Sequence, residues 1–480
     1  MVGDTVGDMT SELFSPLPLR SGQVLGNRIA KAAMEENLAE DGQLPGRRLR
    51  ELYRRWAAGG TGLLITGNVM VHAEALTGPA GVVLDEAAPL EPFAEWARAA
   101  KSGGGAVWMQ INHPGRQVQA DMPGVVWGPS DVGLDLGRHS GRFGRPVAMT
   151  PARIEATVAR FATTAHRAEE AGFDGVEIHA AHGYLLSQFL SPLVNRRTDA
   201  WGGSLENRAR MLLDAVRAVR ADVSPSFAVA VKLNSADFQR GGFDADDARR
   251  VIDMLEPLGV DLVELSGGSF ESPAMMGRPA DAGAGAGAGA AGRTGVRTDA
   301  RDDGRADARA DDCTAGRTDA RTAGRTDRRA DGRTDARTRA REAYFLDLAR
   351  ELARTSPVPL MLTGGITRRE TAEAVLDGGV ALVGMGTALA VTPDLPERWR
   401  HGREADRRMR PVSWSDKALA SAAGMAQVRH QMRRIARGRA PRPGTHPVRA
   451  LLWEQGRQRR ALRRYRAWLA ADGAGCAARG

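Results

Sequence analysis

Eight short apolar runs recur along this chain, and amphipathic stretches separate them. The runs are rich in aliphatic and β-branched residues, which is typical of strands that are covered on both faces. We expect strands over residues 28–33, 62–66, 106–111, 175–179, 228–233, 261–265, 358–363 and 381–385. Helices are expected between them, among others over residues 151–171, 205–221, 244–258, 343–354 and 368–377.

Eight strand–helix units predict an α/β fold, a (β/α)8 barrel of the TIM type. A doubly wound sheet is the alternative, but no G-x-G-x-x-G follows the first strand. No run of eighteen apolar residues occurs, which excludes a membrane-spanning helix. The first residues are acidic where a signal peptide is basic, so we expect a cytoplasmic protein. Two cysteines, Cys313 and Cys476, exclude a disulfide framework and a cysteine-ligated zinc or iron–sulfur centre.

Residues 281–340 differ from the rest of the chain in composition. Gly-Ala repeats give way to imperfect R-T-D-A-R repeats, with 13 Arg, 11 Asp and Val296 as the one large aliphatic residue. Such a segment cannot bury enough apolar surface to offset the entropy of ordering it. We predict a disordered insertion after the sixth strand. A folded calcium-binding repeat is the alternative, and the glycine and aliphatic spacing of such repeats is missing.

The basic charge is concentrated at the C-terminal end. Residues 401–480 hold 19 Lys and Arg against 5 Asp and Glu, so the net charge of +9 leaves −5 for residues 1–400. Helical patterns return over residues 411–470. One apolar face there consists of Leu451, Leu452, Leu462, Tyr465, Trp468 and Leu469. We interpret it as a face that docks on the barrel or on a second subunit; contact with nucleic acid or an anionic membrane is the less favoured alternative.

The predicted organisation therefore has four segments. A barrel is expected over residues 1–280 and 341–400, the insertion over residues 281–340, and a basic helical extension over residues 401–480. The partner of the barrel is expected to be a small molecule, with neither a membrane nor nucleic acid as partner. A homo-oligomer is left open.

Chemistry in a TIM barrel sits at the carboxyl ends of the strands. Polar residues at or after these ends are Glu35, Asn68, Gln110, Asn112, His113, Lys232 and Asn234. The last two strands end in the glycine-rich turns 363–365 and 384–387. Backbone N–H groups in such turns, beside a short helix, form the usual phosphate site of this fold. The alternative is that the glycines only close tight turns. We expect a cofactor that carries a phosphate.

The strongest constellation is E-I-H-A-A-H-G-Y-L, where the fourth strand opens into its loop. His179 and His182 can aim two N–H groups at one point, which suits a carbonyl oxygen that gains negative charge during a reaction. Tyr184 has a reference pKa of ~10, so it stays protonated at neutral pH and can act as a general acid. A metal site formed by the two histidines with Glu177 is the alternative.

The longer segment G-F-D-G-V-E-I-H-A-A-H-G-Y-L-L-S-Q-F-L-S-P, followed by N-R-R-T-D-A-W-G-G-S-L-E-N-R-A-R, resembles the Old Yellow Enzyme family. These proteins are FMN-dependent NAD(P)H:flavin oxidoreductases, also called ene-reductases. The resemblance runs from L-G-N-R-I through M-Q-I-N-H-P-G-R to L-T-G-G-I and G-M-G-T-A-L-A. It covers nearly the whole chain to residue 400, apart from the insertion. It implies FMN across the barrel mouth and NAD(P)H as the hydride donor.

The resemblance also implies which residues hold the cofactor. Those expected to line the flavin, mainly through backbone, are Ala33, Met34 and Gly67. The polar edge of the flavin is expected to meet Gln110 and Lys232, the latter in place of the family's usual arginine. A cation there stabilises the negative charge of reduced flavin. The phosphate is expected to meet Gly365, Gly386 and Thr387, the last at a position where many members have an arginine.

The implied reaction transfers hydride from NAD(P)H through flavin N5 to an activated alkene, such as an α,β-unsaturated carbonyl compound. His179 and His182 would bind the substrate oxygen, and Tyr184 would protonate the α-carbon. Glu35 departs from the family, whose members carry threonine or cysteine at that position; its carboxylate either pairs with a cation such as Lys31 or points outward.

Two alternatives stay open from the sequence. One is a flavin barrel acting on another substrate class, and the lack of a cysteine cluster counts against the known kinds. The other is a non-catalytic scaffold whose arginine-rich tail binds nucleic acid, and the intact histidine–tyrosine motif counts against it.

Overall fold

The computed structural model describes residues 11–272, 346–405 and 408–477. Within them, eight parallel strands form a closed ring: β3 (Ile29–Lys31), β4 (Leu63–Ile65), β7 (Ala106–Asn112), β10 (Gly175–Ala180), β11 (Ala228–Asn234), β12 (Leu262–Ser266), β13 (Leu360–Thr363) and β14 (Leu382–Met385). Pairing of β10 with β7 closes the ring. The predicted (β/α)8 barrel is confirmed, and each expected strand range overlaps one of these strands.

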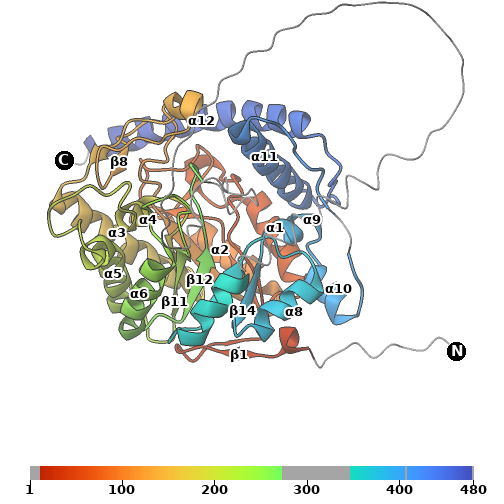
Figure 1. The fold of residues 1–480 in the computed structure, drawn as a ribbon. Helices are drawn as coiled ribbons and strands as arrows, with labels where there is room; N and C mark the ends of the chain where they lie inside the picture. The colour runs from red at the N-terminus through yellow and green to blue at the C-terminus, as the bar shows by residue number, and fades with distance from the viewer. Residues whose placement is uncertain (1–10, 273–345, 406–407, 478–480) are drawn as a thin grey trace, which may run out of the picture. The chain divides into compact units, whose positions relative to one another are not determined.

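Helices connect the strands and cover the outside of the ring (Figure 1). They are α1 (Arg47–Ala57), α2 (Glu91–Ala100), α3 (Pro151–Glu170), α4 (Leu185–Leu190), α5 (Leu205–Asp222), α6 (Ala245–Leu255), α8 (Arg369–Asp377), α9 (Thr387–Val391) and α10 (Leu395–Arg400). Residues 346–355 form a further helix. Side-chain caps explain three of the starts, because Thr150, Ser204 and Asp244 each accept from an N–H three residues on, at 3.0–3.3 Å.

Short strands add to this frame. β5 (Val69–Met70) pairs with β7 and with β6 (Val82–Val83). β1 (Leu17–Pro18) pairs with β2 (Val24–Leu25), and β8 (Trp127–Gly128) pairs with β9 (Val147–Ala148). The predicted insertion over residues 281–340 falls in the connection from β12 to β13 and lies outside the described residues. Its boundaries therefore stay a prediction.

The barrel interior changes from apolar to polar along the strands. Side chains alternate between the two faces of a strand, and the inward ones at the lower levels form an apolar cluster: Ala30, Leu63, Ile65, Trp108, Ala228, Ala230, Leu262, Met361 and Leu382. One step further toward the carboxyl ends, the same alternation turns Gln110, Glu177, Lys232 and Glu264 inward, all of them buried. The floor therefore supplies hydrophobic stability, and the polar layer above it forms the base of the mouth.

The C-terminal extension forms two helices, α11 (Lys417–Ile435) and α12 (Pro447–Ala477). Tyr465 of α12 is fully buried against Met70, Leu76, Val83, Val118 and Met122, and its hydroxyl donates to the Ala73 carbonyl at 2.8 Å. Leu462, Trp468 and Leu469 pack against the same cluster. The predicted docking face therefore meets the barrel loops of its own chain. Leu452 does not take part in this contact, because it is 62% exposed.

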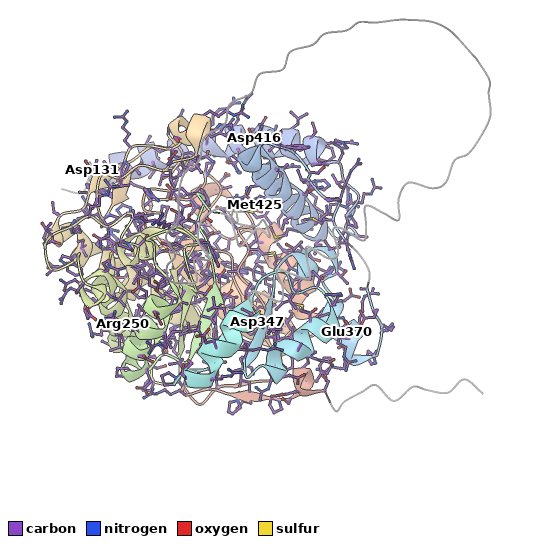
Figure 2. All side chains as sticks on the ribbon, viewed as in Figure 1. Asp131, Arg250, Asp347, Glu370, Asp416 and Met425 are labelled. Carbon is purple, nitrogen blue, oxygen red and sulfur yellow. The ribbon has the colours of Figure 1, made fainter. Side chains whose placement is uncertain are left out.

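The start of α11 is fastened to the loop between β8 and β9. Asp416, labelled in Figure 2, caps the helix by accepting from the Leu419 N–H at 3.0 Å. Its carboxylate also bonds Arg138, and it lies 2.9 Å from Nε2 of His139. The described parts of residues 1–280 and 340–480 form one compact unit. No helix among the described residues is long and apolar enough to cross a membrane.

Candidate active site

Three aromatic side chains meet where β10 ends. His179 is the fifth residue of β10, and His182 and Tyr184 follow in the loop that leads into α4. The His179 ring centroid lies 5.1 Å from that of His182 and 4.9 Å from that of Tyr184, both edge to face. His179 thus contacts both of the other side chains predicted to carry chemistry.

The backbone holds His182 in an unusual conformation. Its backbone φ angle is +60°, a left-handed value that residues other than glycine rarely adopt. Three hydrogen bonds hold the loop in place: the His182 N–H donates to the Asn234 side chain at 3.0 Å, the Gln117 amide donates to the His182 carbonyl at 2.7 Å, and the Asn234 amide donates to the Gly268 carbonyl at 3.1 Å. A strained residue that its surroundings hold this firmly is typical of a functional site.

Both histidines are neutral at physiological pH. Burial lowers the pKa of His179 well below its ordinary value, and burial with the nearby Lys232 lowers the pKa of His182 to about 3. Nδ1 of His179 accepts from the Ala181 N–H at 3.2 Å, which places the ring proton on Nε2. Nε2 of His182 lies 2.7 Å from the Ser266 hydroxyl. His182 therefore has only Nδ1 left for a ligand, whereas His179 can donate from Nε2.

Tyr184 stays protonated across the physiological range. Burial raises the pKa of its phenol, the Glu35 carboxylate raises it further, and Arg429 of α11 opposes them. The ring also lies 6.3 Å from Phe270, a half-exposed aromatic residue in the loop after β12. A buried phenol that keeps its proton can donate it only to a strong base formed in its immediate neighbourhood.

Beneath these rings lies a buried network of charged groups. The Lys232 ammonium bonds the Glu264 carboxylate, and the Gln110 amide donates to Glu177 at 2.5 Å. Burial and the neighbouring Glu264 raise the pKa of Glu177 well above its ordinary value. Burial would also raise the pKa of Glu264, but Lys232 holds it below its ordinary value. The two opposite shifts place the proton on Glu177 in preference to Glu264, whose carboxylate faces the Lys232 ammonium.

The network leaves polar atoms free for a flavin. The side-chain amide N–H₂ of Gln110 donates to Glu177, so the side-chain carbonyl oxygen of Gln110 is available to an N–H group of a ligand. Asn112 follows Gln110 on the same inward face of β7; it is fully buried, and neither amide atom has a partner among the described residues. Unpaired buried amides are costly unless a ligand completes them. These donors and acceptors fit the polar edge of an isoalloxazine.

The glycine turns at the ends of β13 and β14 have the backbone that a phosphate site requires. Gly364 and Gly365 have φ values of +155° and +68°, so side chains would be strained there. Gly386 precedes α9, whose first residue is Thr387. A Cβ at Gly386 would lie 3.5 Å from the Met34 side chain, so the two predicted cofactor residues are neighbours.

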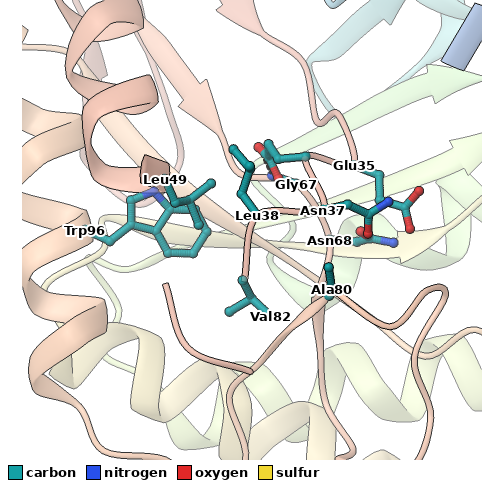
Figure 3. A pocket seen from close by; sticks show the side chains of 11 residues that line it. Glu35, Asn37, Leu38, Leu49, Gly67, Asn68, Ala80, Val82 and Trp96 are labelled. Atoms are coloured by element: carbon teal, nitrogen blue, oxygen red, sulfur yellow. Dashed lines mark hydrogen bonds between the residues drawn. The ribbon is translucent and has the colours of Figure 1, made fainter. Parts of the chain in front are cut away.

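The loop after β3 carries Ala33 and Met34 and is packed firmly from behind. The Gly67 N–H donates to Glu36 and to the Tyr53 hydroxyl, both at 3.0 Å, so Gly67 can offer only its carbonyl and its surface to a flavin. A Cβ at Gly67 would lie 1.8 Å from the Glu36 carboxylate, which explains the glycine. A cavity of about 10 Å³ remains behind the loop, and Figure 3 shows it between Leu38, Gly67, Asn68, Val82 and Trp96.

The structure decides between the alternatives for Glu35 and corrects one expectation about His113. Glu35 pairs with a cation, and that cation is Arg429, whereas Lys31 lies behind the loop, 3.5 Å from Glu36. His113 does not join the mouth, because its ring packs against His72 at 6.4 Å. The metal alternative has no ligand set either, since no group of three or more His, Cys, Asp or Glu suited to a metal occurs in the described residues.

Three contributors escaped the sequence analysis. Ser266 and Glu264 lie on the inward face of β12, and strand alternation in D-L-V-E-L-S could have revealed them. Arg429 lies 394 positions from its partner Glu35, and no local signal predicts that contact.

The barrel, its glycine turns and its polar mouth fit the flavin-dependent oxidoreductases of the (β/α)8 class. Residues 12–284 match the profile of the family described as NADH:flavin oxidoreductase / NADH oxidase. An NADH-dependent flavin oxidoreductase of Hypocrea jecorina is 35% identical over 408 residues, 81% of this chain and 89% of the relative. An NADPH dehydrogenase of Bacillus licheniformis is 36% identical over 269 residues, 54% of this chain and 74% of the relative.

Solved structures share the fold at lower identity. An Old Yellow Enzyme homologue from Zymomonas mobilis superimposes with a TM-score of 0.59 at 24% identity, covering 81% of this chain and 92% of its own. Morphinone reductase in complex with tetrahydroNAD gives 0.60 at 22% identity, covering 82% and 92%. The chain belongs to the NADH:flavin oxidoreductase family, the Old Yellow Enzyme family, and its cofactors are FMN and NAD(P)H.

Proposed function

We propose that this protein reduces activated alkenes, with His179 and His182 binding the substrate oxygen and Tyr184 supplying the proton. FMN, when bound, supplies the hydride chemistry, so that one NAD(P)H and one proton convert the alkene to the saturated product. The observation that carries the proposal is the contact of the three rings at the end of β10. The residues that would hold FMN are Ala33, Met34, Gly67, Gln110, Asn112, Lys232, Gly365, Gly386 and Thr387.

The histidines contribute hydrogen bonds rather than charge. Because burial keeps both rings neutral, His179 donates from Nε2 and His182 from Nδ1, if Ser266 donates to the other nitrogen of His182. Two donors fixed in advance stabilise negative charge that develops on a carbonyl or nitro oxygen. A neutral imidazole is too weak an acid to transfer its proton to the oxygen, so the proton for the carbon comes from Tyr184.

The buried network of charged groups beneath the three rings would support the reduced flavin. Lys232 lies in the polar layer, and its charge is balanced by Glu264. A balanced ammonium still presents N–H donors toward a ligand above it. This arrangement supports reduced flavin through hydrogen bonds, with a smaller electrostatic contribution than an unpaired arginine would make.

The test begins with the absorption spectrum of purified protein and anaerobic bleaching by NADH and by NADPH. The bleached protein is then mixed with 2-cyclohexenone, a nitroalkene and a saturated ketone as control. Return of colour with the two alkenes and not with the ketone supports the proposal. A yellow protein that NAD(P)H bleaches but that no alkene reoxidises would point to another substrate class.

A further inference from the structure

An arginine of the C-terminal extension holds the loop after β3. Arg429 of α11 bonds the Glu35 carboxylate, and its Nε donates to the Glu35 carbonyl at 3.3 Å. With its amide oxygen turned toward the arginine, Asn37 accepts two further hydrogen bonds from Arg429, at 3.0 Å each. The side chains of Arg429 and Glu35 are only 12% and 16% exposed. One buried guanidinium therefore fixes both backbone and side chains of this loop.

The arginine is itself held in position by the extension. Arg429 lies 3.3 Å from Glu454 of α12, which Arg433 contacts at 2.5 Å. Helix α11 also packs against α1 and α9 of the barrel, as Figure 1 shows. The guanidinium is thus fixed by both helices of the extension and is presented to the loop from a packed surface.

The same loop reaches the proposed flavin site. At its start, the Ala32 N–H donates to the carbonyl of the last residue of β14 at 3.0 Å. Met34 follows, and a Cβ at Gly386 would lie 3.5 Å from its side chain. Beyond Met34, Thr77 donates to the Glu35 carboxylate at 2.5 Å. Met34 therefore lies between an anchor on the barrel and an anchor on the extension.

A loop that is held at both ends loses its freedom when the protein folds, so a ligand that binds against it does not have to order it. Release of a ligand packed on Met34 requires the loop to move, and this movement breaks the hydrogen bonds of Arg429. Hydrogen bonds between charged groups are stronger than neutral ones. We therefore expect these contacts to act on the rate at which the ligand leaves, more than on the rate at which it binds.

We infer that Arg429 is a positioning residue of the flavin site: through Glu35 and Asn37 it holds Met34 in place, so that the C-terminal extension retains FMN in the barrel. The inference rests on the proposed placement of Met34 against the flavin. It gives the extension a task in cofactor retention, beyond covering the barrel loops.

The experiment compares Arg429→Met with Arg433→Met in the full-length, FMN-bound protein. Both changes remove one arginine from α11 and from Glu454, but only the first frees the loop. After dilution, free FMN is separated from bound FMN at timed intervals, and its fluorescence gives the release rate. For Arg429→Met we expect release to be about tenfold faster, with the association rate of FMN and apoprotein within about twofold of wild type. For Arg433→Met we expect both rates to stay within about twofold of wild type.

A double variant separates the loss of these contacts from the effect of an unpaired charge. Arg429→Met/Glu35→Gln leaves no carboxylate without its cation, yet the loop has still lost its anchor on the extension. We expect it to release FMN as fast as Arg429→Met does. It also decides the question if Arg429→Met does not fold.

Release at the wild-type rate from the double variant would overturn the inference, as would equal release rates for Arg429→Met and Arg433→Met. None of these measurements uses an alkene. A failure of the proposed alkene reduction would therefore leave the release rates unchanged, and the two proposals can fail separately.

Discussion

Replacing Tyr184 by phenylalanine removes one hydroxyl from the cluster and little else. The contacts of this side chain in the described part of the chain are ring contacts, with His179 at 4.9 Å and Phe270 at 6.3 Å, and phenylalanine preserves both. No protein partner is left unsatisfied, so the free energy of unfolding should change by less than about 1 kcal/mol. FMN binding should also be unchanged.

The effect on alkene reduction should be large and confined to one half-reaction. A positioned general acid contributes about 10²–10⁴-fold, which corresponds to about 2.7–5.5 kcal/mol of barrier. The pKa of Tyr184 is raised by burial and by Glu35, so proton transfer from it is efficient only to a strongly basic carbon. We therefore expect a loss at the lower end of this range, about 10²-fold.

The assay measures the two half-reactions separately by anaerobic stopped flow. Bleaching by NADPH should proceed at the wild-type rate in Tyr184→Phe, because hydride transfer to the cofactor needs no phenol. Reoxidation by 2-cyclohexenone should slow about 10²-fold. Equal reoxidation rates in variant and wild type would refute the reasoning, and equal slowing of both half-reactions would show that the ring positions the cofactor.

Three further predictions concern the network, acid stability and the insertion. Lys232→Met leaves Glu264 buried without its cation, so urea denaturation should show the apoprotein destabilised by about 3–5 kcal/mol. The double variant Lys232→Met/Glu264→Gln should recover most of this loss. Equal instability of both variants would contradict the buried ion pair. Burial lowers the pKa of His113 and of His182 to about 3 each, whereas the pKa of an unfolded histidine is about 6.5. Between these two pH values the unfolded state binds more protons than the folded state, so the free energy of unfolding must decrease as the pH decreases. Going from pH 7 to pH 5 should cost up to about 2 kcal/mol per histidine, and His113→Gln should lose its share of that pH dependence. Deleting residues 281–340 and joining the ends with a short glycine–serine linker should leave folding, colour and alkene reduction within twofold of wild type; loss of folded protein would show that the segment is structural.

Much of the fold and part of the site could be predicted, because they depend on local patterns in the sequence. The rest depends on contacts between segments that are far apart in the sequence. The eight strands were predictable because each is a local apolar run, and the inward direction of His179 and Glu177 follows from strand alternation. The same alternation would have placed Glu264 and Ser266 in the mouth. The role of Gly67 was not predictable, because the groups that occupy its N–H come from Glu36 and Tyr53, on two other elements.

The amino-acid sequence alone determined the barrel, the position of the histidine–tyrosine motif at a strand end and the family to which the chain belongs, because these depend on neighbouring residues and their periodicity. Only the tertiary structure decided that Glu35 pairs with Arg429, that His113 turns away from the mouth and that Leu452 stays exposed on α12. Such contacts depend on which surfaces meet when the helices dock. A partner almost four hundred positions away, as Arg429 is for Glu35, leaves no trace in the local pattern of either segment.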